Sequence, residues 1–203
     1  MDDRAPRNSF PTRIAAVMIA ALCAGAFAGG GPAPAAAESA APFAARAGLE
    51  LASAAAQAWS GDAVLVYVEN DEGLNAADAG AGTSTRWSYL FYSTSHDRAR
   101  VWSVRGGRIV VAEDLDMRFD APPVAAGWLD SGAAIAAAER GAGDELRKLS
   151  GAHLESMLLM RGAFSDGDPD ATTWTLVYRA PGVPSLYVMV SATDGKVQRT
   201  WRG

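Results

Sequence analysis

Two segments that begin with tryptophan restrict the fold of this chain more than any other feature. Residues 87–92 (WSYLFY) and 174–179 (WTLVYR) start 87 positions apart, and in both the large apolar side chains alternate along the segment. Alternation of this kind is typical of a strand that buries one face, because neighbouring side chains in a strand point to opposite sides of the sheet. We therefore expect Trp87 and Trp174 to be core residues of two similar strands.

The first of these segments follows a helix and an earlier strand. Apolar residues recur every three or four positions over 43–58, which predicts a helix, and a β-branched run over 63–68 predicts a strand before a loop at 70–84. Three further strands are expected over 85–93, 99–105 and 108–113. Gly106 and Gly107 join the last two, because both tolerate the positive φ angles of a two-residue hairpin turn.

The same order recurs in the second half of the chain. Asp130 is a candidate N-cap for an alanine-rich helix over 132–140, and a further turn is expected at 144–149. The remaining expected elements are a strand at 154–160, a loop at 166–170 and strands at 174–178, 186–191 and 197–201. We expect an α+β fold of two units, 38–120 and 121–203, each a helix packed on an antiparallel sheet. A single α+β domain with accidental similarity between its halves is the alternative.

Residues 1–37 have the three parts of a secretory signal. Three arginines precede an apolar run over 14–28, and small residues lead up to Ala37. The run is shorter than the roughly 20 apolar residues of a membrane-spanning helix. We therefore expect cleavage near Ala37 and a periplasmic or extracellular protein with no membrane span in its mature chain. An uncleaved anchor is one alternative, and a lipid on Cys23 is another, although Leu22 is larger than the residue such processing requires.

Charge and cysteine content exclude several kinds of function. The chain has 18 basic and 23 acidic residues, a formal net charge of −5, whereas a general nucleic-acid binder needs clustered positive charge. One cysteine and two histidines do not suffice for a multi-cysteine or histidine-rich metal site, and the glycine motifs of phosphate and dinucleotide binding are missing from the sequence. We therefore expect no cofactor and no nucleic-acid partner.

No set of residues predicts catalysis. Ser95, His96 and Asp97 are the residue types of a hydrolase relay, but neighbours in an extended chain point to opposite sides and cannot form that relay among themselves. We expect a protein that is not an enzyme. An envelope enzyme with a dispersed hydrolytic site is the alternative.

One acidic loop has a spacing that metal-binding loops also use. Asp166, Asp168 and Asp170 alternate as calcium ligands can. Ala171 and Val177 stand where an EF-hand loop has its glycine and its glutamate, so that motif is incomplete. These three carboxylates are a weak calcium candidate, and a polar hairpin loop is the alternative.

Arginines gather around the predicted hairpin of the first half. This candidate binding surface consists of Arg98, Arg100, Trp102, Arg105 and Arg108. Arginine next to tryptophan can bind an acidic peptide or an anionic surface through charge-assisted hydrogen bonds and cation–π contacts. A solvated strand face that resists aggregation is the alternative.

Several segments of the second half resemble a known family. They are 127–131 (GWLDS), 154–159 (LESMLL), 174–178 (WTLVY) and 187–197 (YVMVSATDGKV). Together, residues 127–198 look like the PepSY and PepSY-like domains of exported bacterial proteins, and 43–115 are similar to them more loosely. The resemblance implies a cystatin-like α+β unit without catalytic residues. Such units occur in protease propeptides, where inhibition is proposed, and in stand-alone secreted proteins.

Export signal and resemblance together predict a function class. We expect an exported, non-catalytic protein that binds or inhibits a protein or peptide partner at the cell envelope. An exposed sheet edge offers such a partner backbone pairing. A purely structural secreted module is the alternative.

Overall fold

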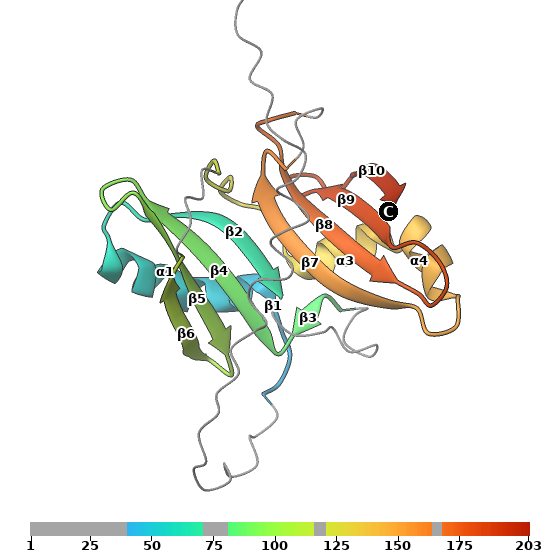
Figure 1. Ribbon diagram of the computed structural model, residues 1–203, viewed down its shortest axis with the longest axis horizontal. Helices are drawn as coiled ribbons and strands as arrows, with labels where there is room; N and C mark the ends of the chain where they lie inside the picture. The colour runs from blue at the N-terminus through green and yellow to red at the C-terminus, as the bar shows by residue number, and fades with distance from the viewer. Residues whose placement is uncertain (1–39, 71–80, 116–120, 164–167) are drawn as a thin grey trace, which may run out of the picture. The chain divides into compact units, whose positions relative to one another are not determined.

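The fold is seen in a computed structural model, which describes residues 40–70, 81–115, 121–163 and 168–203 (Figure 1). The first half contains β1 (Phe43–Ala44), the 3-10 turn η1 (Ala45–Gly48), α1 (Leu49–Trp59), β2 (Val64–Asn70), β3 (Thr83–Ser84), β4 (Arg86–Ser93), β5 (Arg98–Arg105) and β6 (Arg108–Asp114). The second half contains α3 (Ser131–Ala138), α4 (Ala142–Arg147), β7 (His153–Arg161), β8 (Thr172–Arg179), β9 (Leu186–Ser191) and β10 (Val197–Arg202). The expected strands are therefore present.

Eight of the strands form one antiparallel sheet in the order β10-β9-β8-β7-β2-β4-β5-β6. The halves join where β2 pairs with β7, with Val68 opposite Leu159. The tryptophan-led strands β4 and β8 lie at matching places, one strand away from that junction on either side. The α+β class and the antiparallel sheet are thus confirmed. The division into two cystatin-like units, with a boundary near residue 120, stays a prediction, because the strands of both halves belong to one sheet.

The helices pack against one face of the sheet and define its core (Figure 1). Trp87, Tyr89 and Phe91 of β4 share that face, as do Trp174 and Leu176 of β8, which confirms the alternation expected for both strands. Trp87 and Trp174 are completely buried and meet edge to face, with ring centroids 6.0 Å apart. Burial of aromatic surface of this size is a main source of folding free energy. We call this the helix face and the opposite one the open face.

The first helix begins later than the periodicity indicates. Phe43 and Ala44 are drawn into β1, which pairs with β3, and the α-helix starts only at Leu49. The cause is tertiary, because the Trp87 Nε1–H donates to the Phe43 carbonyl at 2.7 Å and the Tyr89 hydroxyl donates to the Ala45 carbonyl at 2.6 Å. Both carbonyls are thereby held outside the α-helix.

Asp130 is the expected N-cap and has a second role as well. Its Oδ1 accepts from the Ser131 backbone N–H at 2.8 Å and from the Arg46 backbone N–H at 3.0 Å. Ser131 Oγ in turn accepts from the Ala45 N–H at 3.0 Å. The start of α3 therefore satisfies backbone donors of η1, which ties the two halves together on the helix face.

Turn geometry follows the glycine positions. Gly106 and Gly107 have φ angles of +54° and +70°, as the two-residue hairpin requires.

Within the described parts of the chain, no helix combines the length and apolar character that crossing a membrane requires.

Candidate functional site

The structure divides the predicted arginine surface into two places. Arg98 and Arg100 both pair with Asp114, at 3.3 and 3.5 Å, near one end of the β5–β6 ladder. Arg105 and Arg108 lie opposite each other at the other end, beside the turn. Trp102 is only 3% exposed and belongs to the core. The surface as a whole stays a prediction, but Trp102 lies beneath it and does not form its exposed centre.

The acidic loop lies only partly within the described residues. Asp166 falls outside them. Asp170 Oδ1 accepts from Arg161 Nη2 at 2.5 Å, and Asp168 accepts from the Asp170 backbone N–H at 2.9 Å. Within the part of the chain that the structure describes, no three His, Cys, Asp or Glu side chains come together as metal ligands would. The calcium candidate therefore stays a prediction.

Ser95, His96 and Asp97 form part of the turn between β4 and β5. The His96 ring stacks on Trp59, with centroids 5.2 Å apart and planes 24° from parallel. Asp97 accepts from the Tyr92 hydroxyl at 2.6 Å. Ser95 donates to Asp62 from both its backbone N–H and its hydroxyl, at 2.7 and 3.0 Å. Each of the three thus makes a contact that supports the turn.

Asp62 is the centre of this turn. Its carboxylate also accepts from the hydroxyls of Ser60 and Ser93, both at 2.6 Å, and from that of Thr94 at 2.7 Å. These hydrogen bonds hold the Asp62 pKa far below its usual range, because they stabilise the charged form of the carboxylate. The hydrogen bond from Ser60 has the largest effect. The carboxylate joins the end of α1 to the β4–β5 turn.

Replacing Asp62 with asparagine is expected to lower the melting temperature in a pH-dependent way. The pKa is lower in the folded than in the unfolded protein, so the carboxylate stabilises the fold above its unfolded value of 3.8. That contribution is lost progressively as the pH falls below this value. Thermal unfolding of the wild type and the variant between pH 2 and 8 should show a difference in melting temperature that is largest at neutral pH and becomes smaller below pH 4. A melting-temperature difference that does not depend on pH would contradict the stabilising effect of the charged Asp62 carboxylate.

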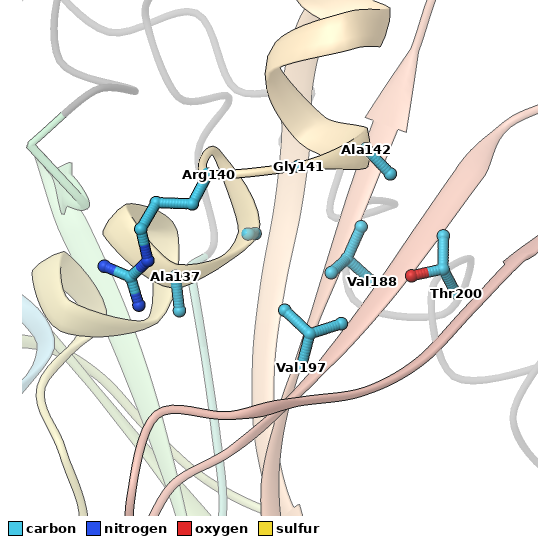
Figure 2. A pocket seen from close by; sticks show the side chains of 8 residues that line it. Ala137, Arg140, Gly141, Ala142, Val188, Val197 and Thr200 are labelled. Atoms are coloured by element: carbon cyan, nitrogen blue, oxygen red, sulfur yellow. The ribbon is translucent and has the colours of Figure 1, made fainter.

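A hollow of about 300 Å³ lies between the corner that joins α3 to α4 and the strand β10 (Figure 2). We call it the β10 hollow. It is lined by Ala137, Ala138, Arg140, Gly141 and Ala142 from the corner and by Val188, Val197 and Thr200 from β9 and β10. Small side chains on the helices leave the space open, and the valines make its floor apolar. The Arg140 side chain extends away from Thr200, so its guanidinium lies at the rim of the hollow.

β10 is the last strand of the sheet, and no described strand covers its outer edge. The Gly203 backbone N–H donates to the Ser185 carbonyl, so Gly203 is at a hydrogen-bonded position of the β9–β10 pair. Hydrogen-bonded and non-hydrogen-bonded positions alternate along an antiparallel strand, which makes Arg202 and Thr200 non-hydrogen-bonded positions. The N–H groups of Thr200 and Arg202 therefore point outward from the sheet. Val197 beside them is 46% exposed. An open backbone edge thus runs along the β10 hollow.

The open face of β10 is aromatic. Trp201 stacks on Tyr187 of β9, with centroids 5.1 Å apart and planes 7° from parallel. The Arg199 guanidinium lies 5.4 Å from the Trp201 ring centroid, within the range of a cation–π contact. The sequence predicted a strand here but not its place at the edge, because strand order depends on pairing between distant residues.

The comparisons with known proteins do not place the chain in a family. No family model and no curated protein matches it. One solved structure is similar, a protein of Clostridium difficile 630 described as a "putative lipoprotein", with a TM-score of 0.47 and 12% identity. The match covers 72% of this chain and 87% of that one.

Proposed function

We propose that the protein is an exported, non-catalytic binding protein, built from two PepSY-like units, that takes up an extended segment of a protein or peptide partner along β10. The observation that carries this proposal is the open edge of β10 beside the β10 hollow. Recognition by strand addition needs these two parts, since backbone pairing supplies affinity and pockets for alternate side chains supply selectivity.

The geometry of an added strand fits the hollow. A segment paired with Thr200 and Arg202 would continue the sheet, and every second side chain would point to the helix face. There it would meet the small residues of the α3–α4 corner, where Ala137 and Ala142 leave space (Figure 2). A branched apolar side chain such as valine would bury its surface against Val188 and Val197.

Sequence and side-chain contacts support the other two parts of the proposal. The basic, apolar and small-residue sections of 1–37 are those of an export signal. The His96 ring packs on Trp59, and Ser95 is bound to Asp62, so the residue types of a hydrolase relay make structural contacts here, which supports a non-catalytic role.

Three labelled peptides test binding at the edge. Each has seven residues, with a valine at the centre, threonine at both ends, and glutamate, glutamine or lysine at the other four positions; we call them the Glu, Gln and Lys peptides. We expect at least one of them to bind the mature chain saturably in a fluorescence anisotropy titration. Thr200→Pro should weaken that binding at least tenfold, because proline removes an outward N–H and obstructs the edge.

Filling the hollow provides a second variant. Ala142→Leu places a larger side chain in the β10 hollow and should weaken binding severalfold, whereas Ala136→Leu changes an exposed position of α3 outside the hollow and should leave it unchanged. Melting temperatures show whether each variant is folded. Saturable binding to none of the peptides, or binding that Thr200→Pro does not alter, would refute the proposal.

A further inference from the structure

Basic side chains border both faces of the β10 edge. Residues 196–203 contain one lysine, two arginines and no acidic residue, although the whole chain carries a net charge of −5. Arg140 of the adjoining α3–α4 corner adds a third arginine. Arg199 pairs with Met189 in the β9–β10 register and lies on the open face with Trp201. Arg202 pairs with Leu186, a core residue, and therefore lies on the helix face with Thr200.

Two acidic side chains that are close to this edge in the sequence are already paired. Asp194 lies 2.8 Å from the Lys196 ammonium, and the Glu139 carboxylate lies 3.1 Å from Arg147. Arg140 makes no ion pair or hydrogen bond through its side chain within the described residues. Arg202 donates one hydrogen bond, to the Pro184 carbonyl at 3.3 Å, and a guanidinium has five N–H donors. Arg140 and Arg202 therefore retain guanidinium N–H groups that can bind an anion.

We infer that the segment taken up by β10 is acidic, with carboxylates on both of its faces; this inference rests on the proposed function. A paired strand projects its side chains alternately to the two sides of the sheet. A carboxylate on the open side would meet Arg199, and carboxylates on the helix side would meet Arg140 and Arg202. Arginine binds carboxylates through two parallel charge-assisted hydrogen bonds, which gives direction as well as attraction.

The spacing on the helix face also fits one pattern. Arg140 extends away from Thr200 (Figure 2). Arg202 follows Thr200 by two residues and lies on the same side of the strand, because their partners Leu186 and Val188 both face the core. An apolar side chain in the hollow would thus have a basic group before it and another after it. The partner expected here carries one apolar residue with acidic residues two positions away on each side.

The other open edge of the sheet has the opposite charge. β6 has Arg108 at its start, but Glu113 and Asp114 are exposed at its end, and Asp114 already holds Arg98 and Arg100. Carboxylates of an acidic segment would be repelled there. Charge therefore directs such a segment to β10.

The Glu, Gln and Lys peptides separate this inference from the proposed function. We expect the Glu peptide to bind at least tenfold more tightly than the Gln peptide, and the Lys peptide most weakly. Arg140→Gln, Arg199→Gln and Arg202→Gln should each weaken binding of the Glu peptide severalfold and leave binding of the Gln peptide unchanged. Arg108→Gln removes the same charge from the β6 edge and should have no effect. Raising the salt concentration should weaken the binding of the Glu peptide and leave the binding of the Gln peptide unchanged, because salt screens the attraction between opposite charges.

The outcomes are distinct. If the Glu and Gln peptides bound with equal affinity and Thr200→Pro abolished binding of both, the inference of an acidic partner would be overturned. The proposal of binding at the β10 edge would stand. If Arg108→Gln weakened binding of the Glu peptide as much as Arg199→Gln does, the peptide would be attracted by general charge and not by the β10 edge. That result would also overturn the inference of an acidic partner. Binding of none of the three peptides would overturn the proposed function together with this inference.

Discussion

Replacing Trp174 with alanine is expected to lower the free energy of unfolding by about 3–5 kcal/mol, the cost of removing a large aromatic side chain from a well-packed core. The side chain is fully buried and packs edge to face with Trp87 and with Trp128, at centroid distances of 6.0 and 5.7 Å. Its Nε1–H donates to the Leu129 carbonyl at 2.7 Å, and that carbonyl would lose this partner. Urea unfolding followed by circular dichroism measures the change.

Two further variants make this prediction specific. Trp174→Phe keeps a ring but removes the N–H donor, so its effect should fall between those of the wild type and the alanine variant. Trp201→Ala removes a half-buried indole that stacks on Tyr187 at the open face, and it should cost less than about 1.5 kcal/mol, since this indole is not part of the buried core. A loss for Trp174→Ala no larger than that for Trp201→Ala would contradict the placement of Trp174 in the core.

Replacing Gly82 with alanine is expected to cost about 3 kcal/mol or more. Its φ angle is +69°, and an added Cβ would lie 2.5 Å from the Gly132 backbone nitrogen and 2.6 Å from the Ser131 carbonyl carbon. Both atoms belong to the backbone of α3, so relief requires the helix to move away from the segment before β3. The cost combines strained backbone with overpacking. The free energy of unfolding from urea titrations gives the size of the effect.

Gly107→Ala is the matched control for that variant. Gly107 has nearly the same φ angle, +70°, but an added Cβ there would meet nothing within 4 Å. Its substitution should therefore cost only the backbone strain, about 1 kcal/mol. Equal losses for the two variants would show that the Gly82 segment does not approach α3 as closely as described.

The local elements of this fold could be predicted from the sequence, and the reasons are physical. Alternation around Trp87 and Trp174 identifies strands because one buried face requires it, and Asp130 identifies a helix start because its carboxylate accepts orphan N–H groups. Gly106 and Gly107 identify a hairpin because of their φ angles. Each of these signals is contained in a few neighbouring residues.

Long-range pairing could not be predicted in the same way. The runs at 63–68 and 154–160 show two buried strands, but nothing local says that β2 and β7 pair with each other and join the halves. Phe43 fits the helical period, yet its carbonyl is captured by Trp87, so the helix starts later. The arginine spacing around Trp102 could not reveal that Asp114 binds Arg98 and Arg100, or that the indole is buried.

The candidate site was missed for a related reason. Alanines and glycines at 137–142 are typical of any helix corner, and a short segment such as 197–202 is typical of any terminal strand. Only the strand order makes β10 an edge, and only the packing of α3 and α4 places a hollow beside it. The signal that could have indicated it is the set of basic residues in 196–202, a segment that contains no acidic residue.

Backbone hydrogen exchange with and without the Glu peptide tests strand addition at β10 most directly. We expect slower exchange of the Thr200 and Arg202 amides in the complex, because their N–H groups would then donate to the added strand, and no change across β6. Protection at β6 instead, or saturable binding that leaves the amides of 197–202 as exchangeable as before, would contradict the assignment of β10 as the binding edge.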